Sequence, residues 1–149
     1  MFNKKKLLAL TCGTIKLDHR INDLGLLASR LALGLMMALA HGINKMPPSE
    51  RFLNGVASLG FPAPFLFAWI AGLTEFIGAI LISLGLATRL NSFLLAITML
   101  VAGLGRHWAD PFKQKELALV YLFAFITFIV TGPGKYSLDH YFFWRLKKS

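Results

Sequence analysis

Ionisable side chains lie inside long apolar stretches of this 149-residue chain, where a charged group is energetically unfavourable unless a partner or a function explains it. Glu75 lies near the middle of the apolar stretch 64–86. If that stretch crosses a bilayer, an unpaired carboxylate at its centre costs at least about 2.5 kcal/mol, so the group must be protonated, paired or in a polar cavity. A buried carboxylate beside an imidazole or an ammonium group can bind polar ligand groups and take up protons. The residues that we expect to form such a pocket are His41, Lys45, Glu75, Arg106 and His107.

The helical spacing of these residues predicts which of them meet. One face of the first apolar stretch carries Arg30, Gly34, Met37, His41 and Lys45. The residues at helical offsets from Glu75 are small, so this carboxylate is predicted to point into the bundle. Side chains lean toward the N-terminus of their own helix, so His41 and Glu75 on antiparallel helices lean toward each other. We therefore predict a His41–Glu75 pair, with Arg30 contacting carbonyl groups or lipid phosphate.

The elements that position this pocket are four apolar runs, each long enough for a membrane span. The chain is 56% hydrophobic and 15% charged, with a mean hydropathy of +0.60. A helix of about 20 apolar residues crosses the hydrocarbon core, and the runs lack the period of two that barrel strands show. We predict an all-α integral membrane bundle of four transmembrane helices, at about 24–46, 63–86, 89–107 and 116–132.

Flanking segments complete the predicted organisation. We assign 1–23 to a basic cytoplasmic N-terminal segment, 24–139 to the four-helix membrane domain and 140–149 to an interfacial or cytoplasmic C-terminal segment. Between the first two spans, apolar residues recur at helical spacing, which predicts a short interfacial helix. The short connection 85–89 makes the second and third spans antiparallel neighbours.

The basic residues predict the orientation. Ten Lys and Arg residues lie on the side of both termini and five on the other, so the positive-inside rule places both termini in the cytoplasm of a bacterial inner membrane. The net charge of +9 then faces anionic lipid, and no base-reading motif accompanies it to indicate nucleic acid binding. The single Cys12 excludes a disulfide within the chain. Structural roles are expected for Arg30, Arg89 and Asp139, the last as a cap or tether of the C-terminal segment.

Several short motifs, in order along the chain, resemble the DoxX family. They are 41–45, 60–64, Glu75 with 84–89, and 132–139. The resemblance extends over about 27–139 and implies a four-helix membrane bundle. It also implies, less specifically, a small subunit linked to quinone-dependent thiosulfate oxidation or to redox-stress complexes.

Three classes of function fit these observations. The first is a quinone- or quinol-binding subunit of an oxidoreductase complex, whose partner protein supplies electrons because the chain has no flavin, iron–sulfur or nucleotide motif. The second is a non-enzymatic accessory or assembly protein; a homo-oligomer is compatible with either. The third is a small-solute transporter with Glu75 and His41 as a protonation switch, although no span shows the mid-membrane break common at transporter sites. Apart from a quinone we expect no cofactor: no covalently bound group, no metal site, and no haem between His41 and His107.

Overall fold

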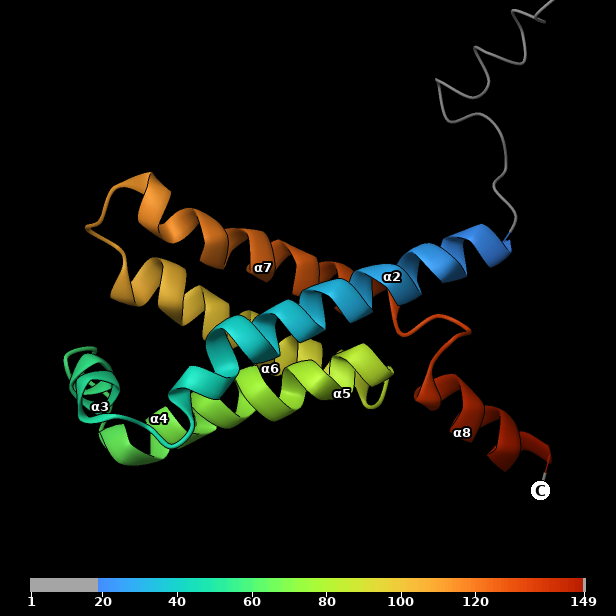
Figure 1. The fold of residues 1–149 in the computed structure, drawn as a ribbon, viewed down its shortest axis with the longest axis horizontal. Coiled ribbons are helices and arrows are strands. Elements are labelled where there is room, and N and C mark those ends of the chain that lie inside the picture. Colours follow the sequence, from blue (N-terminus) through green and yellow to red (C-terminus); the bar gives the residue numbers. More distant parts are fainter. Residues whose placement is uncertain (1–18, 149) are drawn as a thin grey trace, which may run out of the picture.

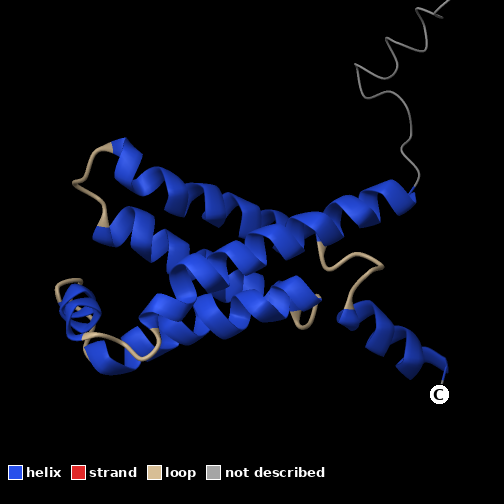
Figure 2. Cartoon of the chain, viewed as in Figure 1, coloured by secondary structure: helices blue, strands red, loops and turns tan. Residues whose placement is uncertain are grey.

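The computed structural model describes residues 19–148, which form helices joined by short connections and contain no strand (Figures 1 and 2). Four of the helices are long and apolar enough to cross a membrane, which confirms the predicted all-α membrane bundle. Their bounds are His19–Lys45, Pro64–Leu84, Thr88–Arg106 and Phe112–Thr131. Most of the predicted basic N-terminal segment, with its four lysines and Cys12, lies outside the described residues.

The first three spans combine more than one helical type. The first consists of α2 (His19–Met37), the π-helical segment η1 (Ala38–Gly42) and the 3₁₀ turn η2 (Ile43–Lys45). The second consists of α4 (Pro64–Leu73), the π-helical segment η3 (Thr74–Gly78) and α5 (Ala79–Leu84). The third consists of α6 (Thr88–Leu100) and the π-helical segment η4 (Val101–Arg106). The fourth span is α7 (Phe112–Thr131), and two shorter helices are α3 (Glu50–Ala57) and α8 (Leu138–Lys148).

Three spans stay continuous but contain π-helical segments, which the sequence analysis does not predict. A π-helical turn closes i→i+5 hydrogen bonds, so it holds about one residue more than an α-helical turn; such segments are rare and are frequent at functional sites. η1 and η3 pack directly against each other. A Cβ atom placed on Gly42 would lie 2.6 Å from the carbonyl carbon and oxygen of Glu75. Gly42 therefore allows the first span to touch the backbone that carries the buried carboxylate.

The connection between the second and third spans is as short as its sequence predicts. Gly85 ends α5 in the left-handed conformation, with φ of 70°. Its amide donates to the carbonyl of Ile82 and the amide of Leu86 donates to that of Leu81, both at 2.9 Å, which is a Schellman ending. Ala87 also has a positive φ, of 47°, and α6 begins at the next residue. The chain thus reverses within three residues, and α5 and α6 pack as neighbours.

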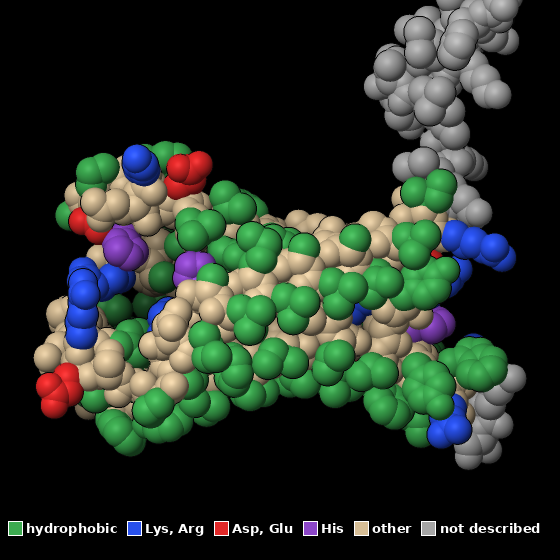
Figure 3. Space-filling view, in the orientation of Figure 1, with side chains coloured by type: hydrophobic (Ala, Val, Ile, Leu, Met, Phe, Trp, Pro, Cys, Tyr) green, Lys and Arg blue, Asp and Glu red, His purple; other side chains and the backbone are tan. Residues whose placement is uncertain are grey.

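The bundle buries small and apolar side chains inside and exposes large apolar ones outside. α2 packs against α5, and α6 against α7. The interior includes Met37, Ile82, Leu95 and Phe125, each no more than 1% exposed. The outer surface carries many exposed Leu, Ile, Val and Phe side chains along the length of the spans, as Figure 3 shows for one face. An apolar outer surface of this extent requires lipid as its solvent.

Candidate functional site

The most deeply buried acid pairs with a lysine near the end of the first span. Glu75, in η3, is 1% exposed, and both of its carboxylate oxygens accept from Lys45 Nζ, at 2.6 and 2.7 Å. Lys45, in η2, keeps 29% of its side chain exposed. Its ammonium also lies 5.2 Å from the ring centroid of Phe52, so α3 covers it from the end of the bundle. The pair joins the first two spans and leaves the ammonium partly accessible.

The predicted His41–Glu75 pair is wrong, because Lys45 occupies that position. The prediction treated the first span as a regular helix and compared only the depth and lean of the side chains. η1 and the following 3₁₀ turn change the rotation and rise between residues 41 and 45. In addition, the long stem of a lysine spans a depth offset that a short imidazole cannot.

His41 instead lies against the fourth span. Its ring meets the ring of Tyr121 edge-on, with centroids 5.8 Å apart and planes at 81°. Tyr121 is 4% exposed and stacks in turn on Phe125, with centroids 5.9 Å apart. Tyr121 is not among the predicted site residues, although a tyrosine at the centre of an apolar span is a signal that the sequence offers. The aromatic contact connects the candidate histidine of the first span to α7.

Arg106 and His107 lie at the same end of the bundle as the Lys45–Glu75 pair but do not hydrogen-bond to it. His107 Nδ1 is 2.6 Å from Asp110 Oδ2, in the connection between α6 and α7. Arg106 reaches toward α3, since a Cβ atom on Gly55 would lie 3.9 Å from its Nε. Figure 3 shows a hollow at this end, with Lys or Arg and His side chains around it. The site at this end therefore has a buried ion pair and, around the hollow, further basic groups.

The same end of the bundle carries an apolar pocket. It has a volume of about 400 Å³ and lies between the end of the third span and the chain that follows α3. Its lining residues are Leu59, Phe61, Leu100, Val101, Leu104 and Gly105. Gly105 directly precedes Arg106 in the sequence, but the lining of the pocket includes none of the charged residues at this end.

Arg30 and Asp139 organise the opposite end. Arg30 is fully buried and donates from Nη1 to the carbonyl of Ile82 at 3.3 Å and from Nη2 to that of Tyr136 at 2.6 Å, which confirms the predicted carbonyl contacts. Asp139 accepts from the amides of Ala87 and Thr88 at 2.7 and 2.8 Å. As predicted, it tethers the C-terminal segment, and it does so by capping α6.

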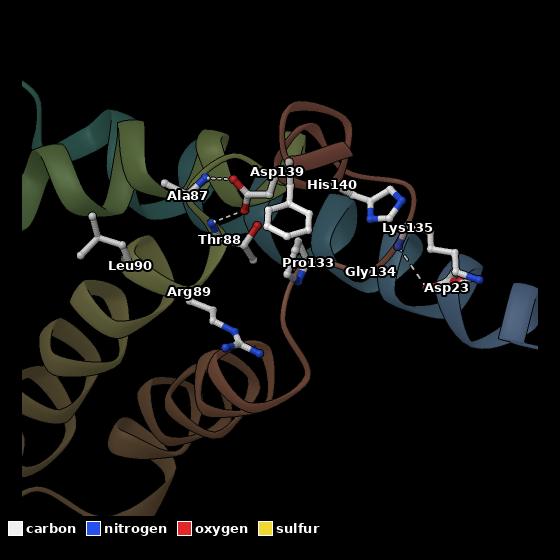
Figure 4. A pocket seen from close by; sticks show the side chains of 11 residues that line it. Asp23, Ala87, Thr88, Arg89, Leu90, Pro133, Gly134, Lys135, Asp139 and His140 are labelled. Carbon is white, nitrogen blue, oxygen red and sulfur yellow. Dashed lines mark hydrogen bonds and ion pairs between the residues drawn. The ribbon is translucent and has the colours of Figure 1, made fainter. Parts of the chain in front are cut away.

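Arg89 occupies a third kind of environment. It is exposed and lies against Gly132, where a Cβ atom would be 3.3 Å from its Nε and Nη2. A pocket of about 670 Å³ opens beside it, between the start of α6, the chain after α7 and the start of α8 (Figure 4). No predicted function used this pocket.

Comparison with known proteins gives one family and several bacterial relatives. The family model for DoxX matches residues 25–108. An uncharacterized protein of Haemophilus influenzae is 38% identical over 117 residues, which cover 72% of this chain and 83% of that protein. The inner membrane protein YphA of Escherichia coli is 35% identical over 127 residues, covering 76% and 87%. A Bacillus subtilis protein named "Putative oxidoreductase CatD" is 29% identical over 122 residues, covering 81% and 89%. No solved structure matches the chain.

Proposed function

The chain belongs to the DoxX family of membrane proteins, and we propose that it is a quinone- or quinol-interacting subunit of a redox complex in a bacterial inner membrane. The observation that carries the proposal is the contact between Lys45 and the fully buried Glu75 inside the membrane-spanning region, with an apolar pocket at the same end of the bundle. A quinone has the matching shape, with polar carbonyl oxygens on a ring and an apolar tail.

The Lys45–Glu75 pair suits a carbonyl oxygen of such a ring. An ammonium group has three donors, and the carboxylate of Glu75 holds this one in place through two hydrogen bonds. The exposed part of Lys45 leaves room for a further acceptor. His41 and the phenol of Tyr121 lie together on the facing spans as further proton-carrying groups. Reduction of a quinone takes up two electrons and two protons, and a partner protein would supply the electrons because this chain carries no redox motif.

Two further arguments support this assignment. One relative is named "Putative oxidoreductase CatD", and this name is compatible with the proposed redox role. The distribution of Lys and Arg favours an orientation with both termini in the cytoplasm. In that orientation the Lys45–Glu75 pair belongs to the outer half of the membrane, and α3 covers it from the outside.

The test is extraction of isoprenoid quinones from protein purified in mild detergent, followed by chromatography of the extract. We expect near-stoichiometric quinone in the wild type and its loss in Lys45→Met and in Glu75→Gln. Lys113→Met is the matched control, because Lys113 is exposed at the start of α7, a span that supplies neither residue of the pair. Equal quinone in all four proteins, or none above the level of an unrelated membrane protein, would contradict the proposal.

The second candidate is an accessory or assembly protein, favoured by the way the buried charges join helices. Glu75 has both oxygens satisfied by Lys45, and Arg30 donates to two carbonyls, so both groups link the first span to other parts of the chain. A wild type that retains no quinone, with both variants losing stability, would assign the ion pair to this role.

A further inference from the structure

Two of the sequence motifs, 84–89 and 132–139, are not used by the proposed function, yet the fold brings them together at the end of the bundle opposite to Lys45. They form most of the walls of the pocket of about 670 Å³ (Figure 4). Asp139 fixes one motif to the other through the amides of Ala87 and Thr88, and its own amide donates to the carbonyl of Gly85 at 2.8 Å. The pocket is therefore built on a backbone held at several points.

The acids that line the pocket are already engaged. Asp139 accepts the two amides at the start of α6. Asp23 accepts the amide of Lys135 at 3.0 Å, and its other oxygen is 3.8 Å from Lys135 Nζ. The lysine side chain remains 62% exposed, so this ion pair is loose. Neither carboxylate forms an ion pair with Arg89, which lines the same pocket.

Arg89 is the basic residue of the pocket that neither carboxylate binds. Among residues 19–148 its guanidinium has no hydrogen-bonding or ion-pairing partner. Figure 4 shows the side chain extending from the start of α6 toward the end of α7. There the guanidinium packs on Gly132, whose positive φ of 75° and missing Cβ leave room for it. A guanidinium held this way presents its remaining donors as a planar fork, which matches phosphate oxygens.

The depth of the pocket in the membrane indicates which molecule could bring a phosphate group to Arg89. It lies where the third span begins, at Thr88, and just after the fourth ends, at Thr131, which is the depth of lipid headgroups. Leu90, Pro133 and Phe143 supply apolar walls. α8 adds a run of exposed aromatic side chains, a composition typical of the membrane interface. The pocket thus combines a free cation with apolar surface at the boundary of the hydrocarbon.

We propose that this pocket binds the headgroup of an anionic phospholipid, with its phosphate on Arg89 and its glycerol and upper acyl region on the apolar walls. Lys135 and His140 lie on the same lining and add donors for a second headgroup oxygen. The inference is independent of the proposed function, because it concerns the other end of the bundle and none of the residues of the Lys45–Glu75 site.

The test is titration of the detergent-purified protein with phosphatidylglycerol, followed by native mass spectrometry, with phosphatidylcholine and inorganic phosphate as comparison ligands. We expect Arg89→Gln to weaken binding of phosphatidylglycerol about tenfold, the effect of losing one charge-assisted pair. Arg89→Lys should lose less, because it keeps the charge without the fork. The matched control is Arg51→Gln, an exposed arginine in α3 at the other end, which should leave binding unchanged.

The remaining outcomes are decisive as well. Equal weakening by Arg89→Gln and Arg51→Gln, or equal affinity of the wild type for both lipids, would overturn the proposal. Displacement of the lipid by millimolar inorganic phosphate would assign the pocket to free phosphate instead. If Arg89→Gln unfolds at a lower temperature than the wild type, Lys135→Gln takes its place, since that exposed side chain can be changed without disturbing the fold. Unchanged binding in Lys135→Gln would then count against the site.

Discussion

Replacement of Gly42 by alanine should separate the first two spans and destabilise the protein. The added Cβ would lie 2.6 Å from the carbonyl carbon and oxygen of Glu75 and from the Cα of Phe76. Ordinary contact begins near 3.4 Å, and all three atoms belong to backbone, so no side chain can rotate away. The two π-helical segments must move apart by most of an ångström. Overpacking of this kind costs about 1–3 kcal/mol. The shift also strains the Lys45–Glu75 pair, because Lys45 lies only three residues after Gly42.

The matched control is the same substitution in the same span. Gly25 in α2 has nothing within 4 Å of its Cβ position, so alanine there meets open space. In an exposed helix position the change from glycine to alanine stabilises by about 0.5–1 kcal/mol. Titration with sodium dodecyl sulfate in detergent micelles, followed by far-UV circular dichroism, gives both free energies of unfolding. If Gly42→Ala is as stable as Gly25→Ala, the direct contact between η1 and η3 is refuted.

Two further predictions use the same titration. Lys45→Met leaves the carboxylate of Glu75 buried without a partner and should cost about 3 kcal/mol, whereas Glu75→Gln leaves a lysine that can reach water and should cost about 1 kcal/mol. The double variant should recover part of the loss, and strictly additive losses would show that the two groups do not interact. Asp139→Asn keeps one acceptor for the amides of Ala87 and Thr88 but removes the charge at the start of α6, so we expect a loss of about 1–2 kcal/mol. Asp110→Asn, in a half-exposed pair with His107, is its control and should change stability by less than about 0.5 kcal/mol.

The architecture could be predicted because the signals that determine it are local. Long apolar runs require helices in lipid, and breakers such as Pro64 and Gly85 mark where helices begin and end. The tight turn after Gly85 follows from its left-handed conformation, which glycine adopts without strain. These features depend on composition and on single residues, so no tertiary information is needed to find them.

The contacts within the candidate site were harder to predict, because they depend on departures from regular helix. The sequence predicts that Glu75 points into the bundle and is protonated, paired or in a polar cavity, and the structure shows it buried and paired with Lys45. The sequence does not indicate that η1 and η3 are π-helical, since such segments have no sequence pattern that separates them from an α-helix. Regular helix geometry therefore predicts His41 as the partner, whereas in the structure the longer side chain of Lys45 reaches the carboxylate.

Two further contacts are absent from the sequence-based prediction, one between distant residues and one between near neighbours. Arg30 donates a hydrogen bond to the carbonyl of Tyr136, more than a hundred positions away in the chain. Asp110 was not singled out, although it lies three residues after His107 and pairs with it. The first contact depends on how the C-terminal segment folds back, which local pattern cannot reveal. The second could have been found from spacing alone.

The π-helical segments also affect how related chains should be aligned and redesigned. Each segment inserts one residue into a span, so the helix beyond it is rotated by about 100° relative to an uninterrupted helix. Deleting one residue from η3 would restore an ordinary helix of nearly the same length and hydropathy. It would also turn Ala79 and Ser83 away from Gly34, which now packs against both. A single-residue gap inside a span of a relative therefore marks a change in which face is buried, even where every aligned residue on either side is identical.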